Sequence, residues 1–74
     1  MQLELLEPTK VEVYGTGKSV DVAPGVHEVV EENHRGSPWW FLQGTTHGLP
    51  VAVWNLLIGV RRAKIVDSDA LVAH

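Results

Sequence analysis

Five side chains able to bind a metal ion or to carry a proton are gathered between positions 27 and 34. They are His27, Glu28, Glu31, Glu32 and His34. Side chains alternate between the two faces of an extended strand, so a strand here would put His27 and Glu31 on one face and Glu28 on the other. The spacing of two histidines that a zinc-binding helix needs is also absent. We therefore expect neither a metal site nor a cofactor.

Acid–base catalysis is the second chemistry to consider, because His34 and His47 flank the most aromatic part of the chain. A general acid or base needs an apolar cleft in which its pKa can shift, and copies of either histidine could meet in a symmetric assembly. No Ser/His/Asp or Cys/His arrangement can be built, since the chain lacks cysteine and its three serines fall in predicted turns or in the tail. We name no catalytic residue and favour a binding protein. An enzyme whose active site forms at the centre of a homo-oligomer is the alternative.

The segment from Gly15 to Ser19 reads Gly-Thr-Gly-Lys-Ser and ends as phosphate-binding loops do. That motif needs another glycine five residues before Gly17, where Glu12 stands, and a helix after it. An alternating strand pattern follows instead. We therefore predict that this segment is the turn of a β-hairpin.

Charge is strongly segregated along the chain. Residues 1–32 contain seven acids and two lysines, a net charge of −5, whereas residues 33–66 contain no acid and four basic residues, Arg35, Arg61, Arg62 and Lys64. Acidic strands lying beside basic strands would explain this pattern through cross-strand ion pairs, which is the explanation we prefer. A basic patch beside aromatic residues would instead suit single-stranded nucleic acid, but four positive charges in a chain of net charge −3 are a weak signal.

Three of the five aromatic residues follow one another directly after Pro38. On a strand, Trp39 and Phe41 point to one face while Trp40 points to the other with Leu42, so both faces are apolar. A small domain has one core, and the second face needs cover from a partner chain, a ligand or another part of the same chain. We expect self-association into a dimer or tetramer. We also expect an aromatic groove for a small molecule or peptide, lined by Tyr14, Trp39, Trp40 and Trp54.

The elements that must position these residues are short strands separated by turn residues. Alternating and β-branched runs predict strands at residues 2–7, 10–14, 19–22, 26–32, 39–43, 49–54 and 60–66. The first is expected to be an edge strand or an ordered arm, residues 33–38 a polar loop, and residues 55–57 a brief helical turn. An amphipathic helix over residues 51–60 is the alternative, which its β-branched residues and Gly59 disfavour. Beyond the last strand, Asp67-Ser68-Asp69 could cap a short turn.

Five or six short strands with frequent turns predict an all-β small barrel, because a closed sheet has no exposed edges. The 74 residues form one domain, 1–74, of the size that buries only about 60% of its unfolded surface. Without cysteine, oligomerisation is the readiest extra source of stability, and a reducing compartment is favoured. We see neither a signal peptide nor an apolar run long enough to cross a membrane, and expect a soluble, cytoplasmic protein.

Residues 38–66 resemble the second half of an SH3-like barrel. A tandem tryptophan opens a strand, a turn runs from Gly44 to Gly48, and Gly48-Leu49-Pro50 precedes Trp54-Asn55-Leu56-Leu57. In the family a tandem tryptophan, a Gly-x-x-Pro stretch and an Asn-containing helical turn come in the same order. The acidic, tyrosine-rich loop that binds proline-rich peptides in eukaryotic members has no counterpart here. The resemblance implies an SH3-like fold in which Trp39 and Asn55 line the ligand groove.

Overall fold

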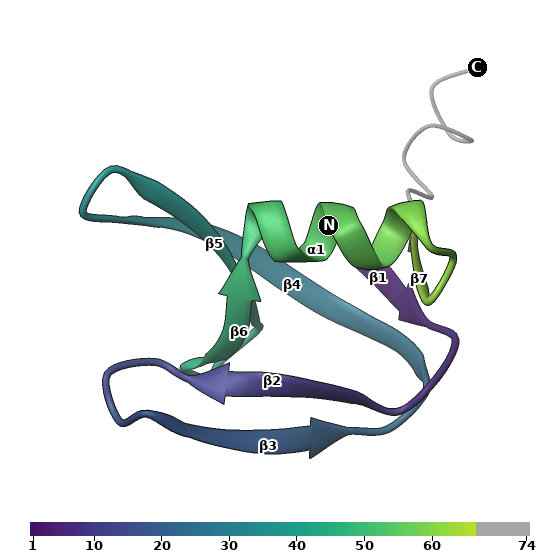
Figure 1. The fold of residues 1–74 in the computed structure, drawn as a ribbon, viewed down its shortest axis with the longest axis horizontal. Helices are drawn as coiled ribbons and strands as arrows, with labels where there is room; N and C mark the ends of the chain where they lie inside the picture. Colours follow the sequence, from purple (N-terminus) through teal and green to yellow (C-terminus); the bar gives the residue numbers. More distant parts are fainter. Residues whose placement is uncertain (67–74) are drawn as a thin grey trace.

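The computed structural model describes residues 1–66, which form seven strands and one helix (Figure 1). In chain order the elements are β1 (Gln2–Leu5), β2 (Thr9–Val13), β3 (Lys18–Val22), β4 (Gly25–His34), β5 (Ser37–Leu42), β6 (His47–Pro50), α1 (Val51–Gly59) and β7 (Ala63–Val66). All neighbouring strands are antiparallel, in the order β3-β2-β6-β5-β4-β1-β7. The predicted all-β class is therefore confirmed, with seven strands where five or six were expected.

The sheet is curved, and β4 joins its two parts (Figure 1). The first residues of this ten-residue strand pair with β1, up to Glu28, and the rest pair with β5 from Val29 onward. β3 and β7 end the strand order, so the sheet is open. The helix α1 contacts β5, β6 and β7 and completes a small barrel-like fold.

The predicted hairpin turn after β2 is confirmed. Residues 14–17 form the turn between β2 and β3, which pair in antiparallel register from Thr9 with Val22 to Val13 with Lys18. The Thr16 hydroxyl donates a hydrogen bond to the Val13 carbonyl oxygen at 2.9 Å. The Gly-Lys-Ser sequence thus belongs to a hairpin, and a strand follows it instead of a helix.

The β4–β5 connection is shorter than the polar loop predicted for residues 33–38. Only Arg35 and Gly36 lie between the two strands, and their φ angles are 55° and 81°. Two successive positive φ angles are what a two-residue type I′ hairpin turn requires. The loop prediction was wrong because the hairpin pairing extends to its tip, with His34 opposite Ser37.

The prediction of β1 as an edge strand or arm was also wrong. β1 lies between β4 and β7, with Leu3 and Leu5 fully buried. Glu4 stands directly opposite Lys64 on β7, and Glu4 Oε1 lies 3.4 Å from Lys64 Nζ. An acidic residue of the first strand therefore pairs with a basic residue of β7, as the charge pattern indicated.

The segment after β6 is a helix, and the strand predicted at residues 49–54 with a helical turn at 55–57 was wrong. β6 stops at Pro50, whose φ of −56° suits the residue before a helix and whose nitrogen has no N–H to leave unpaired. The helix buries Trp54 completely. Truncating a buried tryptophan costs about 3–5 kcal/mol, whereas a valine costs less than about 1 kcal/mol in helix propensity, so packing decides this segment.

The end of α1 reverses the chain through a Schellman motif. The Arg61 N–H donates to the Ile58 carbonyl at 3.1 Å, and the Arg62 N–H donates to the Leu57 carbonyl at 2.9 Å. Arg61, with φ of 63°, occupies the left-handed position that glycine usually fills. Because this turn uses residues 60–62, the last strand is shorter than the predicted 60–66. The predicted turn at 67–69 lies outside the described residues.

The hydrophobic core fills the inside of the curved sheet beneath α1. Its buried members are Leu3, Leu5, Val11, Val22, Val29, Trp40, Leu49, Trp54 and Ala63. Trp54 Nε1 donates to the Trp40 carbonyl at 3.1 Å, and Trp40 Nε1 donates to Glu31 Oε1 at 2.8 Å. Both indole N–H groups are therefore paired, which avoids the cost of burying an unsatisfied donor.

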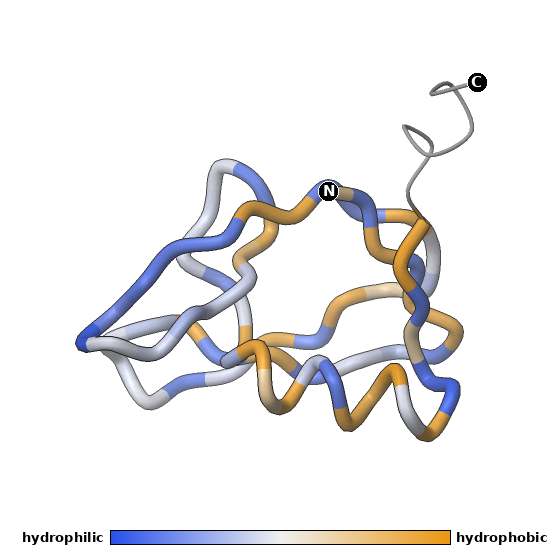
Figure 2. Tube along the Cα trace, turned by 90° about the horizontal axis from the view of Figure 1, so that it is seen from above, coloured by the Kyte–Doolittle hydropathy of each residue, from blue (hydrophilic) through white to orange (hydrophobic). Residues whose placement is uncertain are grey.

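The outer side of α1 is apolar but exposed. Hydrophobic residues recur along the whole helix in the hydropathy view (Figure 2). Leu56 and Val60, four residues apart and so on one helical stripe, are 70% and 65% exposed. Within residues 1–66, no helix is long and apolar enough to cross a membrane.

Candidate ligand-binding site

The five residues predicted to line one groove lie in separate environments. Trp40 and Trp54 belong to the core, with only 7% and 0% of their surface exposed, so they do not line a groove at the surface. Asn55 is exposed on α1. Tyr14 and Trp39 are half-buried and touch, with ring centroids 5.1 Å apart in a T-shaped arrangement. A single groove of all five is not formed, because α1 turns Trp54 into the core.

The second face of β5 is covered by other side chains of the same chain. Phe41 is buried beneath three rings, with centroid distances of 5.3 Å to His34, 5.6 Å to Trp39 and 6.0 Å to Tyr14. We call these four residues the aromatic cluster. The sequence left three ways to cover this face: a partner chain, a ligand or another part of the same chain. The third is what the structure shows. The surplus of aromatic residues therefore does not by itself require a partner.

The two histidines considered for acid–base chemistry both lie near Glu32. His34 packs on Tyr14 at 4.3 Å, and its Nε2 lies 3.3 Å from Glu32 Oε1 in a geometry that makes no hydrogen bond. His47 lines a shallow depression that also includes Glu32 and Val30. Neither histidine lines the more enclosed cavity described below.

The remaining members of the His/Glu group between 27 and 34 have other partners. His27 Nε2 lies 2.8 Å from the Ala23 carbonyl oxygen, and Glu28 Oε2 lies 2.7 Å from the amino group of Met1. Glu31 accepts the hydrogen bond from the Trp40 indole. Among residues 1–66, no group of three or more His, Asp or Glu side chains is close enough to hold a metal ion.

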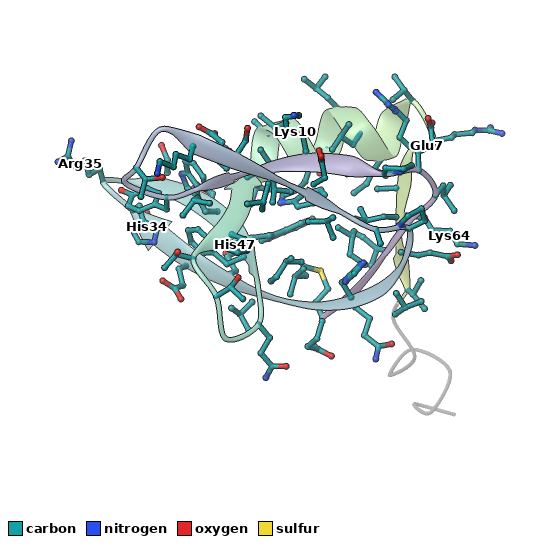
Figure 3. All side chains as sticks on the ribbon, turned by 90° about the horizontal axis from the view of Figure 1, so that it is seen from below. Glu7, Lys10, His34, Arg35, His47 and Lys64 are labelled. Carbon is teal, nitrogen blue, oxygen red and sulfur yellow. The ribbon has the colours of Figure 1, made fainter. Side chains whose placement is uncertain are left out.

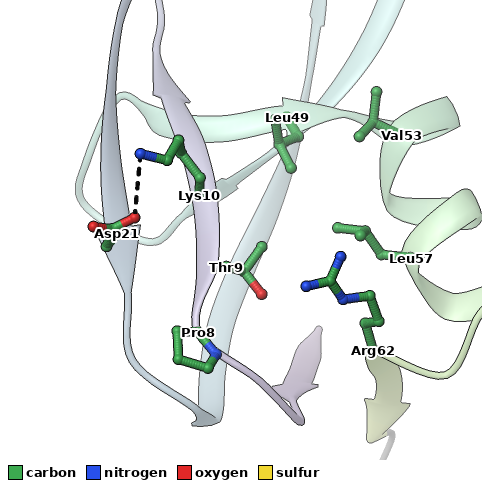
Figure 4. Close-up of a pocket in the computed structure, with 8 residues that line it drawn as sticks. All are labelled: Pro8, Thr9, Lys10, Asp21, Leu49, Val53, Leu57 and Arg62. Carbon is green, nitrogen blue, oxygen red and sulfur yellow. Dashed lines mark ion pairs between the residues drawn. The ribbon is translucent and has the colours of Figure 1, made fainter.

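A cavity of about 350 Å³ lies between β2 and α1 (Figure 4). It is lined by Pro8, Thr9, Lys10, Asp21, Leu49, Val53, Leu57 and Arg62. This volume lies near the lower end of the roughly 300–1,000 Å³ that is usual for small-molecule sites. We call it the helix–strand cavity.

One wall of the helix–strand cavity is apolar and depends on the helix. Val53 and Leu57 stand four residues apart on one face of α1, and Leu49 on β6 extends the wall. The sequence pattern did not indicate this wall, because residues 49–54 were predicted to form a strand, in which residues four apart do not share a helical face. The alternative prediction, a helix over residues 51–60, would have placed Val53 and Leu57 on one helical face.

The opposite wall carries polar groups held by Glu7. The buried Thr9 donates its hydroxyl hydrogen to the Glu7 carbonyl at 3.0 Å, and Arg62 Nε donates to Glu7 Oε2 at 3.2 Å. Figure 4 shows the Arg62 guanidinium between Thr9 and Leu57. At the rim, Lys10 Nζ and Asp21 Oδ1 are 3.7 Å apart and both side chains are exposed, so this ion pair contributes little.

The basic residues after position 32 do not gather into one patch. Arg35 and Lys64 lie at opposite ends of the molecule (Figure 3). Lys64 is paired with Glu4, and Arg62 is paired with Glu7. Two of these four basic residues are thus paired with acids near the start of the chain.

No family model, no curated protein and no solved structure matches this chain. The resemblance of residues 38–66 to SH3-like barrels stays a prediction.

Proposed function

We propose that this protein is a binding module whose ligand is a small molecule held in the helix–strand cavity. The observation that carries the proposal is the meeting of an apolar wall with a guanidinium group and a buried hydroxyl in a space of about 350 Å³. Small-molecule sites combine such walls with a few convergent polar groups, which fix the orientation of the ligand.

The cavity supports a small molecule better than a peptide. A peptide groove would need the exposed aromatic surface expected from the sequence, and two of its predicted residues, Trp40 and Trp54, are in the core. The helix–strand cavity lies between β2 on one side and α1 on the other, and its volume of about 350 Å³ suits a small molecule. The occupant should therefore match the width of the wall formed by Val53 and Leu57.

A fragment screen by ¹H–¹⁵N NMR tests this proposal. Binders should shift the amide signals of Thr9, Leu49, Val53 and Leu57 together. The substitution Leu57→Phe should fill the cavity and abolish those shifts. Leu56→Phe makes the same chemical change at the next residue, which is 70% exposed and outside the cavity, and should leave binding intact.

Two results would contradict the proposal. One is a screen in which no compound shifts the cavity amides. The other is equal binding to both phenylalanine variants, once thermal unfolding has shown that each is folded. In either case the cavity would be an ordinary packing defect between β2 and α1.

Self-association is a second candidate property, which the exposed stripe on α1 supports. The helix carries no charged residue, and Leu56 and Val60 leave an apolar surface open to solvent. A matching partner surface must itself be apolar and uncharged, and the same stripe on a second copy meets that need about a two-fold axis. A domain of 74 residues also gains stability from such cover.

Light scattering at two salt concentrations tests self-association. A dimer that resists salt and becomes monomeric in Leu56→Lys would support contact through the stripe. Lys18→Glu is the control. Lys18 lies on the edge strand β3, away from α1, so this variant should not change the mass. A monomer at all concentrations, or a dimer that persists in Leu56→Lys, would exclude this interface.

A further inference from the structure

Arg62 is anchored at the helix–strand cavity by contacts made outside it. Its N–H donates to the Leu57 carbonyl at 2.9 Å in the Schellman motif, and its carbonyl accepts from the Leu6 N–H at 2.9 Å. Its Nε donates to Glu7 Oε2 at 3.2 Å. The backbone of Arg62 is therefore positioned before any ligand arrives, and the half-exposed contact with Glu7 orients its side chain, which lowers the entropy cost of binding to this group.

The other end of the same guanidinium is open to the cavity. Within residues 1–66, the two Nη atoms of Arg62 make no hydrogen bond, and the group lies beside Leu57 in Figure 4. The planar fork of N–H groups in arginine matches the two oxygens of a carboxylate. A carboxylate next to an apolar tail would thus meet the fork and the wall of Val53 and Leu57 at once.

Among the charged and polar groups of the cavity, Arg62 is the best placed to bind a ligand carboxylate. Lys10 and Asp21 lie 3.7 Å apart at the rim, where their opposite charges offset each other. The hydroxyl hydrogen of Thr9 is donated to the Glu7 carbonyl, so Thr9 offers only acceptor lone pairs. Glu7 partly neutralises Arg62, but its hydrogen bond uses Nε, and no hydrogen bond within residues 1–66 uses the Nη atoms.

From this arrangement we infer that the ligand is a small carboxylic acid with a compact apolar tail. Its carboxylate binds the Nη atoms of Arg62, and its tail contacts Val53, Leu57 and Leu49. The inference rests on the proposed function, because it names the ligand class for the same cavity. Its test must therefore separate the occupancy of the cavity from the preference for a carboxylate.

A matched pair of probes makes that separation. Hexanoate and hexan-1-ol have the same carbon chain, and each is titrated into the ¹⁵N-labelled full chain while the cavity amides are followed by NMR. Hexanoate should bind more tightly than hexan-1-ol by about fivefold or more, the range of a partly exposed, charge-assisted contact. In Arg62→Gln the affinity for hexanoate should fall to that for hexan-1-ol, while hexan-1-ol binding is unchanged.

Arg61→Gln is the control, since it removes the same charge one residue away and Arg61 is not a lining residue. Arg62→Lys keeps the charge without the fork and should retain only part of the preference. If hexan-1-ol binds as well as hexanoate, or if Arg62→Gln keeps the preference, the carboxylate inference fails and the cavity remains a binding site. If neither probe shifts the cavity amides and the fragment screen also finds no binder, the proposed function fails with it.

Discussion

The two faces of β5 bury aromatic side chains in different ways. On the inner face, Trp40 joins a continuous core with Trp54, and each indole N–H has a hydrogen-bond acceptor. On the outer face, Phe41 is covered by three rings that are themselves half-exposed. The inner face is closed by a helix, whereas the outer face is closed only by side chains. A strand with two apolar faces therefore does not need a partner chain when neighbouring strands of the same chain supply enough aromatic rings.

This difference predicts unequal contributions to stability. Removing an inner ring leaves a cavity in a close-packed interior and an unpaired polar group. Removing a half-exposed outer ring exposes apolar surface to water that already touches the site. Inner substitutions should therefore cost more than outer ones on the same strand.

The largest effect is expected for Trp54→Ala. Loss of a fully buried tryptophan should cost about 3–5 kcal/mol, a large part of the roughly 5–15 kcal/mol that stabilises a domain. Trp54→Phe keeps most of the apolar volume but leaves the Trp40 carbonyl without its donor, which should cost about 1–3 kcal/mol. Urea denaturation followed by circular dichroism measures both. A loss below about 1 kcal/mol for Trp54→Ala would break the comparison.

An intermediate effect is expected for Gly48→Ala, which acts on the backbone of β5 and on the Phe41 ring. A Cβ atom at Gly48 would stand 2.8 Å from Phe41 Cα and Cδ1, and closer still to the Trp40 carbonyl oxygen. Backbone atoms of β5 cannot yield without disturbing the β5–β6 pairing, so the substitution should cost about 1–3 kcal/mol.

Gly59→Ala is the matched control for this substitution. Its Cβ would meet nothing within 4 Å, and alanine favours the helix, so a gain of up to about 1 kcal/mol is expected. If the free energy of unfolding falls in Gly48→Ala and rises in Gly59→Ala in the same denaturation experiment, the close packing at Gly48 is supported. A gain in both would show that β5 and β6 can separate at no cost.

The smallest effect is expected for Trp39→Ala. Trp39 is half-buried and stacks on Phe41 at 5.6 Å, and such an aromatic pair contributes about 0.5–1.5 kcal/mol beyond area burial. A double-mutant cycle with Phe41→Leu would isolate this coupling. If Trp39→Ala lowers the free energy of unfolding as much as Trp54→Ala does, the aromatic cluster is a second core and the contrast between the two faces disappears.

Most of the strands, and the distribution of charge among them, could be predicted from residue patterns alone. Alternation of polar and apolar residues and the glycines after Tyr14 are local signals, and they identified the β2–β3 hairpin and β4. The pairing of acidic and basic strands also followed from composition, as the contact between Glu4 and Lys64 shows. The hairpin and β4 depend on neighbours in the chain, so a local sequence pattern is enough to predict them.

Only the tertiary structure decided the state of residues 51–59, the cover of the outer face of β5, and the cavity. Local propensity favoured a strand after Pro50 by a small margin, and burial of Trp54 reversed it. That one change put Val53 and Leu57 on a common wall and allowed the chain to turn at Arg61 and bring Arg62 opposite them. Contacts between residues distant in the chain made these choices, because the energy of packing a large side chain exceeds the differences in local propensity.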